Sequence, residues 1–116
     1  MSGIVFFGTE DISRLKKFYT ERIGARIWKD QRDCIIFRKG DFRFAFCERE
    51  GKPETCGIIT FVFDSRDTVD KVYYRLEDIA EGEPESRVPY YNIYQFFGKD
   101  PEGRTLEFQC FLDESE

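Results

Sequence analysis

Hydrophobic residues recur along the start of the chain at two spacings, which predict a strand followed by a helix. An apolar run at residues 4–7 precedes apolar positions at three- and four-residue intervals over residues 12–23. This spacing places the apolar side chains on one face of a helix. The stretch Thr9-Glu10-Asp11 provides a helix N-cap with acids in the first turn, and Gly24 is a natural helix end.

Three strand-like stretches follow this helix, at residues 25–30, 34–40 and 42–48. Gly40-Asp41 joins the last two as a hairpin, because this residue pair favours a tight turn. The first half of the chain is therefore predicted to contain one strand, one helix and three further strands.

The second half of the chain repeats this order. Residues 57–65 predict a strand that enters a helix through Asp64-Ser65, and apolar positions at helical spacing continue to Ile79. After a looser segment at residues 83–92, two strands are predicted, and they lie at residues 93–100 and 104–112. An offset of 54 positions also aligns four residue pairs, which are Ile4 with Ile58, Phe7 with Phe61, Lys17 with Lys71, and Tyr19 with Tyr73. These observations indicate an internal duplication.

A fold class follows from the two repeats. The chain is expected to form a single α+β domain over residues 1–116, with repeats at about 3–50 and 56–113. Each repeat has one helix to cover one face of its strands, so the other face must be covered differently. Two βαβββ repeats predict a cupped eight-stranded mixed sheet with helices on the convex side and a hollow for a small ligand.

Charge and composition exclude several classes of function. The chain has 18 basic and 23 acidic residues, a net charge of −5, which disfavours nucleic acid and mildly favours a cationic ligand. No apolar run approaches the roughly 20 residues of a membrane span, and no signal peptide is evident, so we expect a cytoplasmic protein. The four cysteines (34, 47, 56 and 110) lack C-x-x-C spacing and are expected to be small buried hydrophobes.

The chain contains no histidine. This removes the commonest metal ligand and the side chain best suited to proton transfer near neutral pH. Ser-His-Asp and Cys-His nucleophile systems are excluded for the same reason.

Two stretches resemble the vicinal oxygen chelate superfamily, which includes glyoxalase I, bleomycin-resistance proteins, extradiol dioxygenases and methylmalonyl-CoA epimerase. "TEDISRLKKFYTERIGARIW" is similar to the opening motif of the family, with Asp11, Phe18, Tyr19 and Ile23-Gly24 in the corresponding places. "FFGKDPEGRTLEFQ" is similar to its DP-x-G-x-x-x-E ending, supplied by Asp100, Pro101, Gly103 and Glu107. The resemblance implies the doubled βαβββ fold and a homodimer.

The resemblance also indicates where metal-using members carry their ligands. These positions fall on Ile4, Ile58, Glu107 and, by strand alternation, Ala45, with a slip to Phe46 or Cys47 left open. Isoleucine and alanine cannot bind a divalent ion, and one carboxylate is too few ligands for metal catalysis. We therefore expect no metal and no other cofactor.

Strand alternation and the resemblance together give a set of candidate site residues. Glu107 is the only candidate for catalysis, as a general base, although it could instead be a solvated carboxylate or a partner of Arg43. The candidate ligand-binding residues are Glu107, Thr105, Gln109, Arg43, Cys47, Phe6 and Tyr94. The tyrosine-rich stretch "VPYYNIY" is expected to border the mouth of the hollow or a subunit interface.

Two functions remain open. The first is a metal-independent small-molecule-binding protein of the glyoxalase/bleomycin-resistance type, with no nucleic-acid or membrane partner. The alternative is a lyase, isomerase or dioxygenase with an atypical metal site that includes Glu107 with Glu48, Cys47 or Gln109. The sequence leaves open whether the protein is an enzyme.

Overall fold

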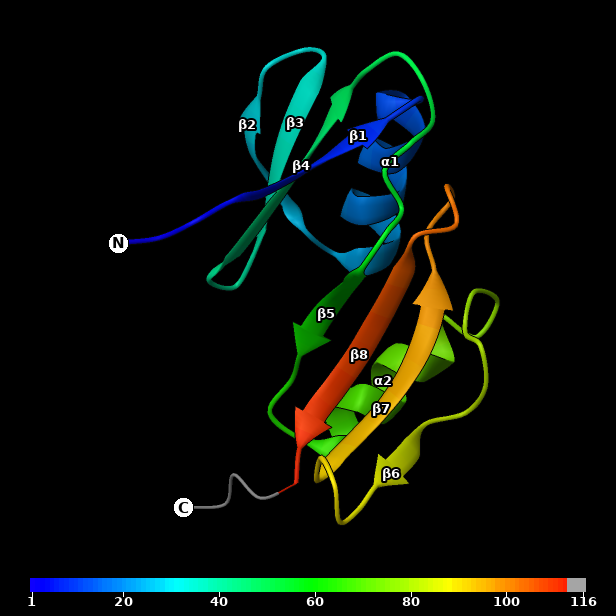
Figure 1. Ribbon diagram of the computed structural model, residues 1–116. Coiled ribbons are helices and arrows are strands. Elements are labelled where there is room, and N and C mark those ends of the chain that lie inside the picture. Colours follow the sequence, from blue (N-terminus) through cyan, green and yellow to red (C-terminus); the bar gives the residue numbers. More distant parts are fainter. Residues whose placement is uncertain (113–116) are drawn as a thin grey trace. The chain divides into compact units, whose positions relative to one another are not determined.

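The computed structural model describes residues 1–112 and divides the chain into two compact units, Met1–Thr55 and Cys56–Glu116 (Figure 1). Each unit contains its own four-stranded mixed sheet and its own helix. Residue 113, the predicted end of the second repeat, lies outside the described residues. The two-repeat α+β layout predicted from the sequence is confirmed.

The first unit follows the predicted order of strand, helix and three strands. Its elements are β1 (Val5–Thr9), α1 (Ile12–Phe18), the π-helical segment η1 (Tyr19–Ile23), β2 (Arg26–Asp30), β3 (Cys34–Lys39) and β4 (Phe42–Glu48). The strands lie in the order β1-β4-β3-β2, with β1 parallel to β4 and the other pairs antiparallel.

The first helix begins and ends within the stretches that the sequence predicts, although its first turn contains no acid. Asp11 is the N-cap, because its side chain accepts a hydrogen bond from the Arg14 amide at 3.1 Å. After Phe18 the helix continues into η1, and Gly24 ends it with a left-handed φ of 80°. Glycine adopts this conformation without a steric penalty, which explains the stop.

An aromatic cluster forms the core of the first unit. The Tyr19 side chain is fully buried, and its ring centroid lies 5.6, 5.3 and 4.9 Å from those of Phe37, Phe44 and Phe46. Aromatic pairs at such distances contribute about 0.5–1.5 kcal/mol each beyond the burial of their area. The even-numbered phenylalanines of β4 therefore face the helix, as strand alternation predicts.

The second unit repeats the architecture with one short strand. Its elements are β5 (Ile58–Val62), α2 (Arg66–Arg75), β6 (Glu85–Arg87), β7 (Ile93–Lys99) and β8 (Thr105–Phe111), with the strand order β5-β8-β7-β6. Figure 1 shows α2 against one face of β7 and β8. Strand β6 lies in the looser segment at residues 83–92, where the sequence predicts no strand because these three residues are exposed and carry no apolar alternation.

The helix-facing side of the second sheet is also aromatic. The Phe96 ring lies 5.4 Å from Tyr73 of α2 and 4.8 Å from Phe108, which in turn stacks on Phe61 at 5.6 Å. Leu106 and Cys110, which flank Phe108 on the same face of β8, are also buried. The opposite face of this sheet is therefore the one left for Glu107 and its neighbours.

The expectation of four small buried cysteines is wrong for three of them. Cys34 and Cys47 form a disulfide bond, because the β3–β4 register places them directly opposite each other with a Cα–Cα distance of 4.0 Å. Cys56 is exposed, whereas Cys110 is buried as predicted. Since disulfides are rare in reducing compartments, this bond does not favour the expected cytoplasmic location, which stays a prediction.

No helix within residues 1–112 is long and apolar enough to cross a membrane.

Candidate functional site

A pocket of about 430 Å³ lies on the face of the second sheet that is turned away from α2. Three strands and the β6–β7 connection contribute to it, and its lining residues are Ile58, Tyr91, Ile93, Phe97, Glu107, Gln109 and Phe111. Within residues 1–112, Glu107 supplies the single carboxylate of this lining. The pocket therefore combines a mainly apolar wall with one acid.

Strand pairing explains why these side chains meet. Phe97 of β7 lies directly opposite Glu107 of β8, and Ile93 lies opposite Phe111. Side chains opposite each other in an antiparallel pair point to the same face of the sheet. The parallel pairing of β5 with β8 adds Thr60 beside Glu107 on this face.

Neutral donors hold the Glu107 carboxylate. Thr60 Oγ1 donates to Glu107 Oε1 at 2.8 Å, and Gln109 Nε2 donates to the same oxygen at 3.2 Å. The Gln95 amide has one orientation in which both of its ends form hydrogen bonds. In that orientation Gln95 Nε2 donates to Glu107 Oε2 at 3.2 Å, and Gln95 Oε1 accepts from Arg87 Nε at 3.1 Å. Within residues 56–112, no Lys or Arg forms an ion pair with Glu107.

The amide oxygen of Gln109 has no partner. Within the described part of the chain, Gln109 Oε1 and Arg43 Nε are the buried side-chain polar atoms without a hydrogen bond. Gln109 is only 9% exposed, so water does not readily reach this oxygen. A buried acceptor without a donor costs about 1–3 kcal/mol, which a bound group that carries an N–H or O–H would recover.

The structure brings Glu107 and Gln109 into this pocket but separates the other candidates of the second unit from it. Thr105 lies on the same face of β8, where its hydroxyl accepts a hydrogen bond from Lys99 Nζ at 2.7 Å. Tyr94 lies on the opposite face, because it pairs with the buried Cys110.

The Tyr94 side chain links β7 to α2. Its hydroxyl donates to Asp70 Oδ1 at 2.6 Å, and the Arg66 guanidinium lies 4.3 Å from the ring centroid. The hydrogen bond to Asp70 raises the pKa of Tyr94, and burial of the ring raises it further. This residue therefore stabilises the contact between β7 and α2.

The candidates of the first unit lie on the corresponding face of the first sheet. Phe6, which is 45% exposed, is directly opposite Ala45, and the Arg43 guanidinium lies 4.5 Å from the Trp28 ring centroid. The sulfur of Cys47 is bonded to that of Cys34, so it offers no free thiol to a ligand.

The two units match residue by residue around Glu107. The pair Phe6–Ala45 occupies the place in the first sheet that Thr60–Glu107 occupies in the second. Ala45 is therefore the counterpart of Glu107, as strand alternation predicted. By the same registers, the bonded pair Cys34–Cys47 corresponds to Gln95–Gln109, which lie opposite each other in β7 and β8.

The residues at the four positions that metal-using members employ do not fit a metal ion. The resemblance placed three of four metal-ligand positions on Ile4, Ala45 and Ile58, and these side chains have no donor atom. Of the alternative ligands, Cys47 is in a disulfide bond and Glu48 Oε2 accepts a hydrogen bond from the Ile12 amide at 3.2 Å. No group of three or more Cys, Asp or Glu residues among residues 1–112 is placed to hold an ion.

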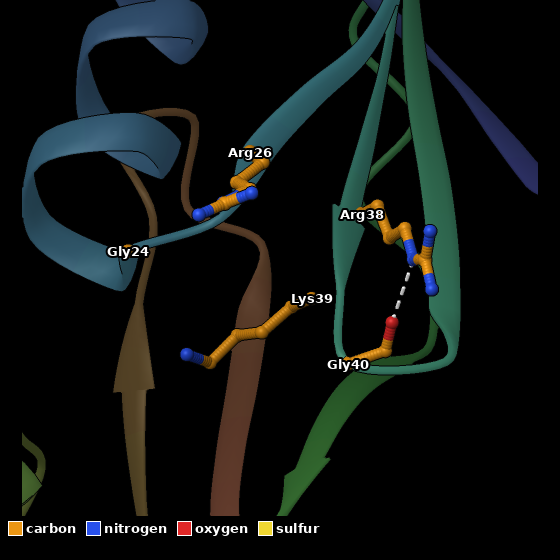
Figure 2. Close-up of a pocket in the computed structure, with 5 residues that line it drawn as sticks. All are labelled: Gly24, Arg26, Arg38, Lys39 and Gly40. Atoms are coloured by element: carbon orange, nitrogen blue, oxygen red, sulfur yellow. Dashed lines mark hydrogen bonds between the residues drawn. The ribbon is translucent and has the colours of Figure 1, made fainter.

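A second pocket, of about 360 Å³, lies in the first unit and is lined by Gly24, Arg26, Arg38, Lys39 and Gly40 (Figure 2). Figure 2 shows that the side chains of Arg26 and Lys39 extend to one side, whereas that of Arg38 turns the other way. Arg38 Nε donates to the carbonyl oxygen of Gly40 at 2.8 Å. The three cations do not converge on one point, so they form a weaker candidate site than the Glu107 pocket.

Sequence reasoning missed several residues of the Glu107 site. Thr60 and Gln95 bind the carboxylate, and Phe97 and Ile93 form the wall. The alternation within residues 93–99 was a usable signal, because it places every second side chain with Glu107. Tyr91, in the stretch expected to border a hollow, lines this pocket.

Two βαβββ units, each with a helix on one sheet face and candidate binding residues on the other, define the vicinal-oxygen-chelate class of protein. Residues 3–108 match the sequence family described as Glyoxalase/Bleomycin resistance protein/Dioxygenase superfamily. The chain belongs to this superfamily. A comparison with curated proteins finds no significant match in sequence.

Several solved structures share the fold. A glyoxalase/bleomycin resistance protein/dioxygenase from Nocardioides aligns with a TM-score of 0.78 at 16% identity, over 100% of this chain and 86% of that one. A lactoylglutathione lyase from Agrobacterium tumefaciens aligns with a TM-score of 0.77 at 16% identity, over 100% of this chain and 97% of that one. A glyoxalase/bleomycin resistance protein/dioxygenase family enzyme from Burkholderia phytofirmans PsJN aligns with a TM-score of 0.79 at 18% identity, over 94% of this chain and 97% of that one.

Proposed function

We propose that the protein binds a small molecule without a metal, in the pocket that contains Glu107. The observation that carries this proposal is that the Glu107 carboxylate is held by the neutral side chains of Thr60, Gln109 and Gln95 within an apolar wall. A pocket with apolar walls and a few placed polar groups is the usual form of a small-molecule site.

The hydrogen-bond partners of Glu107 among residues 1–112 support binding over catalysis. A general base must lie within reach of a substrate proton. Catalysis is more efficient when further protein groups stabilise the charge that develops on the substrate. Glu107 is surrounded by an alcohol and two amides, which position it but do not exchange protons near neutral pH. Superfamily membership alone is compatible with either role, because one fold serves many functions.

A ligand screen tests the proposal. Drugs, amino acids and coenzyme fragments are added to the protein, and its thermal unfolding is followed. A ligand present at one hundred times its Kd stabilises the folded state by about 2.7 kcal/mol. We expect at least one compound to raise Tm, and we expect Glu107→Ala to lose this response. Glu77→Gln, which changes an exposed acid elsewhere, is the control and retains the response. A broad screen without any stabilising compound would contradict the proposal.

Metal content is measured on the same preparation. The protein is loaded with zinc, manganese, iron or nickel, and the excess metal is removed. We expect the bound metal to amount to well below one atom per chain. Stoichiometric metal, together with an activity that a chelator abolishes, would favour the lyase, isomerase or dioxygenase alternative.

The homodimer implied by the family resemblance stays part of the proposal. Gel filtration with light scattering is expected to give about twice the 13.8 kDa of one chain. A species of 13.8 kDa would contradict it.

A further inference from the structure

We infer that the Glu107 pocket recognises a protonated primary or secondary amine, or an amidinium, attached to an apolar body. This inference rests on the proposed function, because it names the chemical class of the ligand for that same pocket. Three independent features of the pocket lead to it: the charge of Glu107, the unpartnered oxygen of Gln109 and the apolar wall.

The first feature is a negative charge that lacks a direct ion pair within residues 56–112, because Arg87 reaches Glu107 only through the Gln95 amide. Thr60, Gln109 and Gln95 donate neutral hydrogen bonds to Glu107, and no Lys or Arg within residues 56–112 pairs with it. Hydrogen bonds between a carboxylate and a cation are roughly twice as strong as those between neutral groups. A cationic ligand would therefore add the interaction that the protein leaves out, whereas an anionic ligand would be repelled.

The second feature decides which kind of cation fits. Gln109 Nε2 donates to Glu107 Oε1 at 3.2 Å, and the oxygen of the same amide is a buried acceptor without a donor. Both residues line the pocket, and Gln109 Oε1 belongs to the same amide that donates to Glu107, so the two acceptors lie close together. Satisfying both requires a group with at least two N–H bonds, which a quaternary ammonium does not have.

The third feature is the wall around these acceptors. Ile58, Ile93, Phe97 and Phe111 supply apolar surface, and the exposed ring of Tyr91 lies at the border. Aromatic faces also attract cations. A volume of about 430 Å³ can hold a ring with a short aminoalkyl chain.

Four matched probes test the inference by calorimetric titration. The probes are 2-phenylethylamine, 2-phenylethanol, N,N,N-trimethyl-2-phenylethylammonium and 3-phenylpropanoate, which share one ring and differ in the polar group. We expect the amine to bind about tenfold more tightly than the alcohol and the quaternary ion, as a charge-assisted hydrogen bond predicts, and the anion not to bind.

Two variants locate the effect. Glu107→Gln keeps an acceptor for Thr60 but removes the charge, so the preference for the amine over the alcohol is expected to disappear. Gln109→Leu removes the unpartnered acceptor and is expected to bring the amine and the quaternary ion closer in affinity. Glu77→Gln removes one negative charge at an exposed position, as Glu107→Gln does in the pocket, and is expected to leave the affinities for all four probes unchanged.

The outcomes separate this inference from the proposed function. Equal binding of the amine and the alcohol, or of the amine and the quaternary ion, overturns the amine assignment but leaves small-molecule binding in place. Absence of amine binding at millimolar concentration also overturns it. The proposed function itself fails when the broad thermal screen finds no stabilising compound, or when the protein holds stoichiometric metal that its activity requires.

Discussion

Arg104 Nη1 lies 2.6 Å from Asp100 Oδ2, and both side chains are almost completely buried. The second oxygen of Asp100 accepts hydrogen bonds from the amides of Glu102 and Arg104 at 2.9 and 3.0 Å. Arg104 Nη2 also reaches Glu102 Oε1 at 3.2 Å. The DP-x-G motif is thus a turn built around a buried ion pair, which sets the start of β8 and the register of Glu107.

Removing the charge of Asp100 is expected to be strongly destabilising. Asp100→Asn removes the nearer of the two carboxylates that pair with the buried Arg104 guanidinium, and breaking a buried pair costs about 3–5 kcal/mol. Urea denaturation measures the free energy of unfolding of the variant and the parent. Asp41→Asn, in the exposed Gly40-Asp41 turn, is the control. The double variant Asp100→Asn/Arg104→Met should recover part of the loss. A single variant within 1 kcal/mol of the parent would show that the pair contributes little.

The cysteines are expected to react in a fixed order. The exposed Cys56 is alkylated first, whereas Cys110 reacts slowly because burial raises the pKa of its thiol. Cys34 and Cys47 react only after reduction, so unfolded protein should show two thiols before reductant and four after it. Closing a loop of this length stabilises the folded state by about 3 kcal/mol, and Cys34→Ser/Cys47→Ser should lose that amount. Four thiols without reductant would contradict the bond.

The hydrogen bond from Tyr94 to Asp70 predicts a loss of stability at high pH. The pKa of Tyr94 is raised in the folded state, so the neutral phenol is the form that the fold favours. Its contribution is complete below pH 10 and is lost as the pH rises through the raised pKa. Tyr94→Phe should lower the free energy of unfolding by about 1–2 kcal/mol at neutral pH and flatten its decline above pH 10.

Spectroscopic titration follows the same group directly. When the folded parent is titrated with base, part of the tyrosinate absorbance should develop only well above pH 10, as a late phase. In Tyr94→Phe, the amplitude of this late phase should fall by about the contribution of one tyrosine. Tyr74→Phe, at an exposed position on α2, is the matched control and should keep the late phase. An unchanged late phase in Tyr94→Phe would rule out the assignment.

Gly98 is expected to tolerate no side chain. A Cβ at this position would lie 3.0 Å from the carbonyl oxygen of Ile79, which belongs to the backbone and cannot rotate away. Gly98→Ala should therefore destabilise the protein by about 1–3 kcal/mol, measured by thermal unfolding. Gly3→Ala meets no atom within 4 Å and should change Tm little. Equal Tm values for the two variants would contradict the close approach.

Local patterns in the chain were enough to determine most of the fold. Helical spacing, the cap stretch Thr9-Glu10-Asp11 and the Gly24 end predicted the first helix, because these signals depend only on neighbouring residues. Period-two alternation assigned Leu106 and Phe108 to the helix side and Glu107 to the other, since a strand side chain has only two faces to choose from.

Strand β6 could not be found in this way. Its three exposed residues bury no apolar side chain, so β7 holds it through backbone pairing and no sequence pattern marks it.

Contacts between distant residues were decided only by the tertiary structure. The bond between Cys34 and Cys47 and the hydrogen bonds of Thr60 and Gln95 to Glu107 depend on which strands are neighbours and in what register. A one-residue slip would turn every side chain to the opposite face. The sequence by itself therefore determined the elements other than β6, the duplication and the lone acid on β8. Tertiary pairing decided which groups surround that acid, because hydrogen bonds act over about 3 Å and the chain brings those groups together only when it folds.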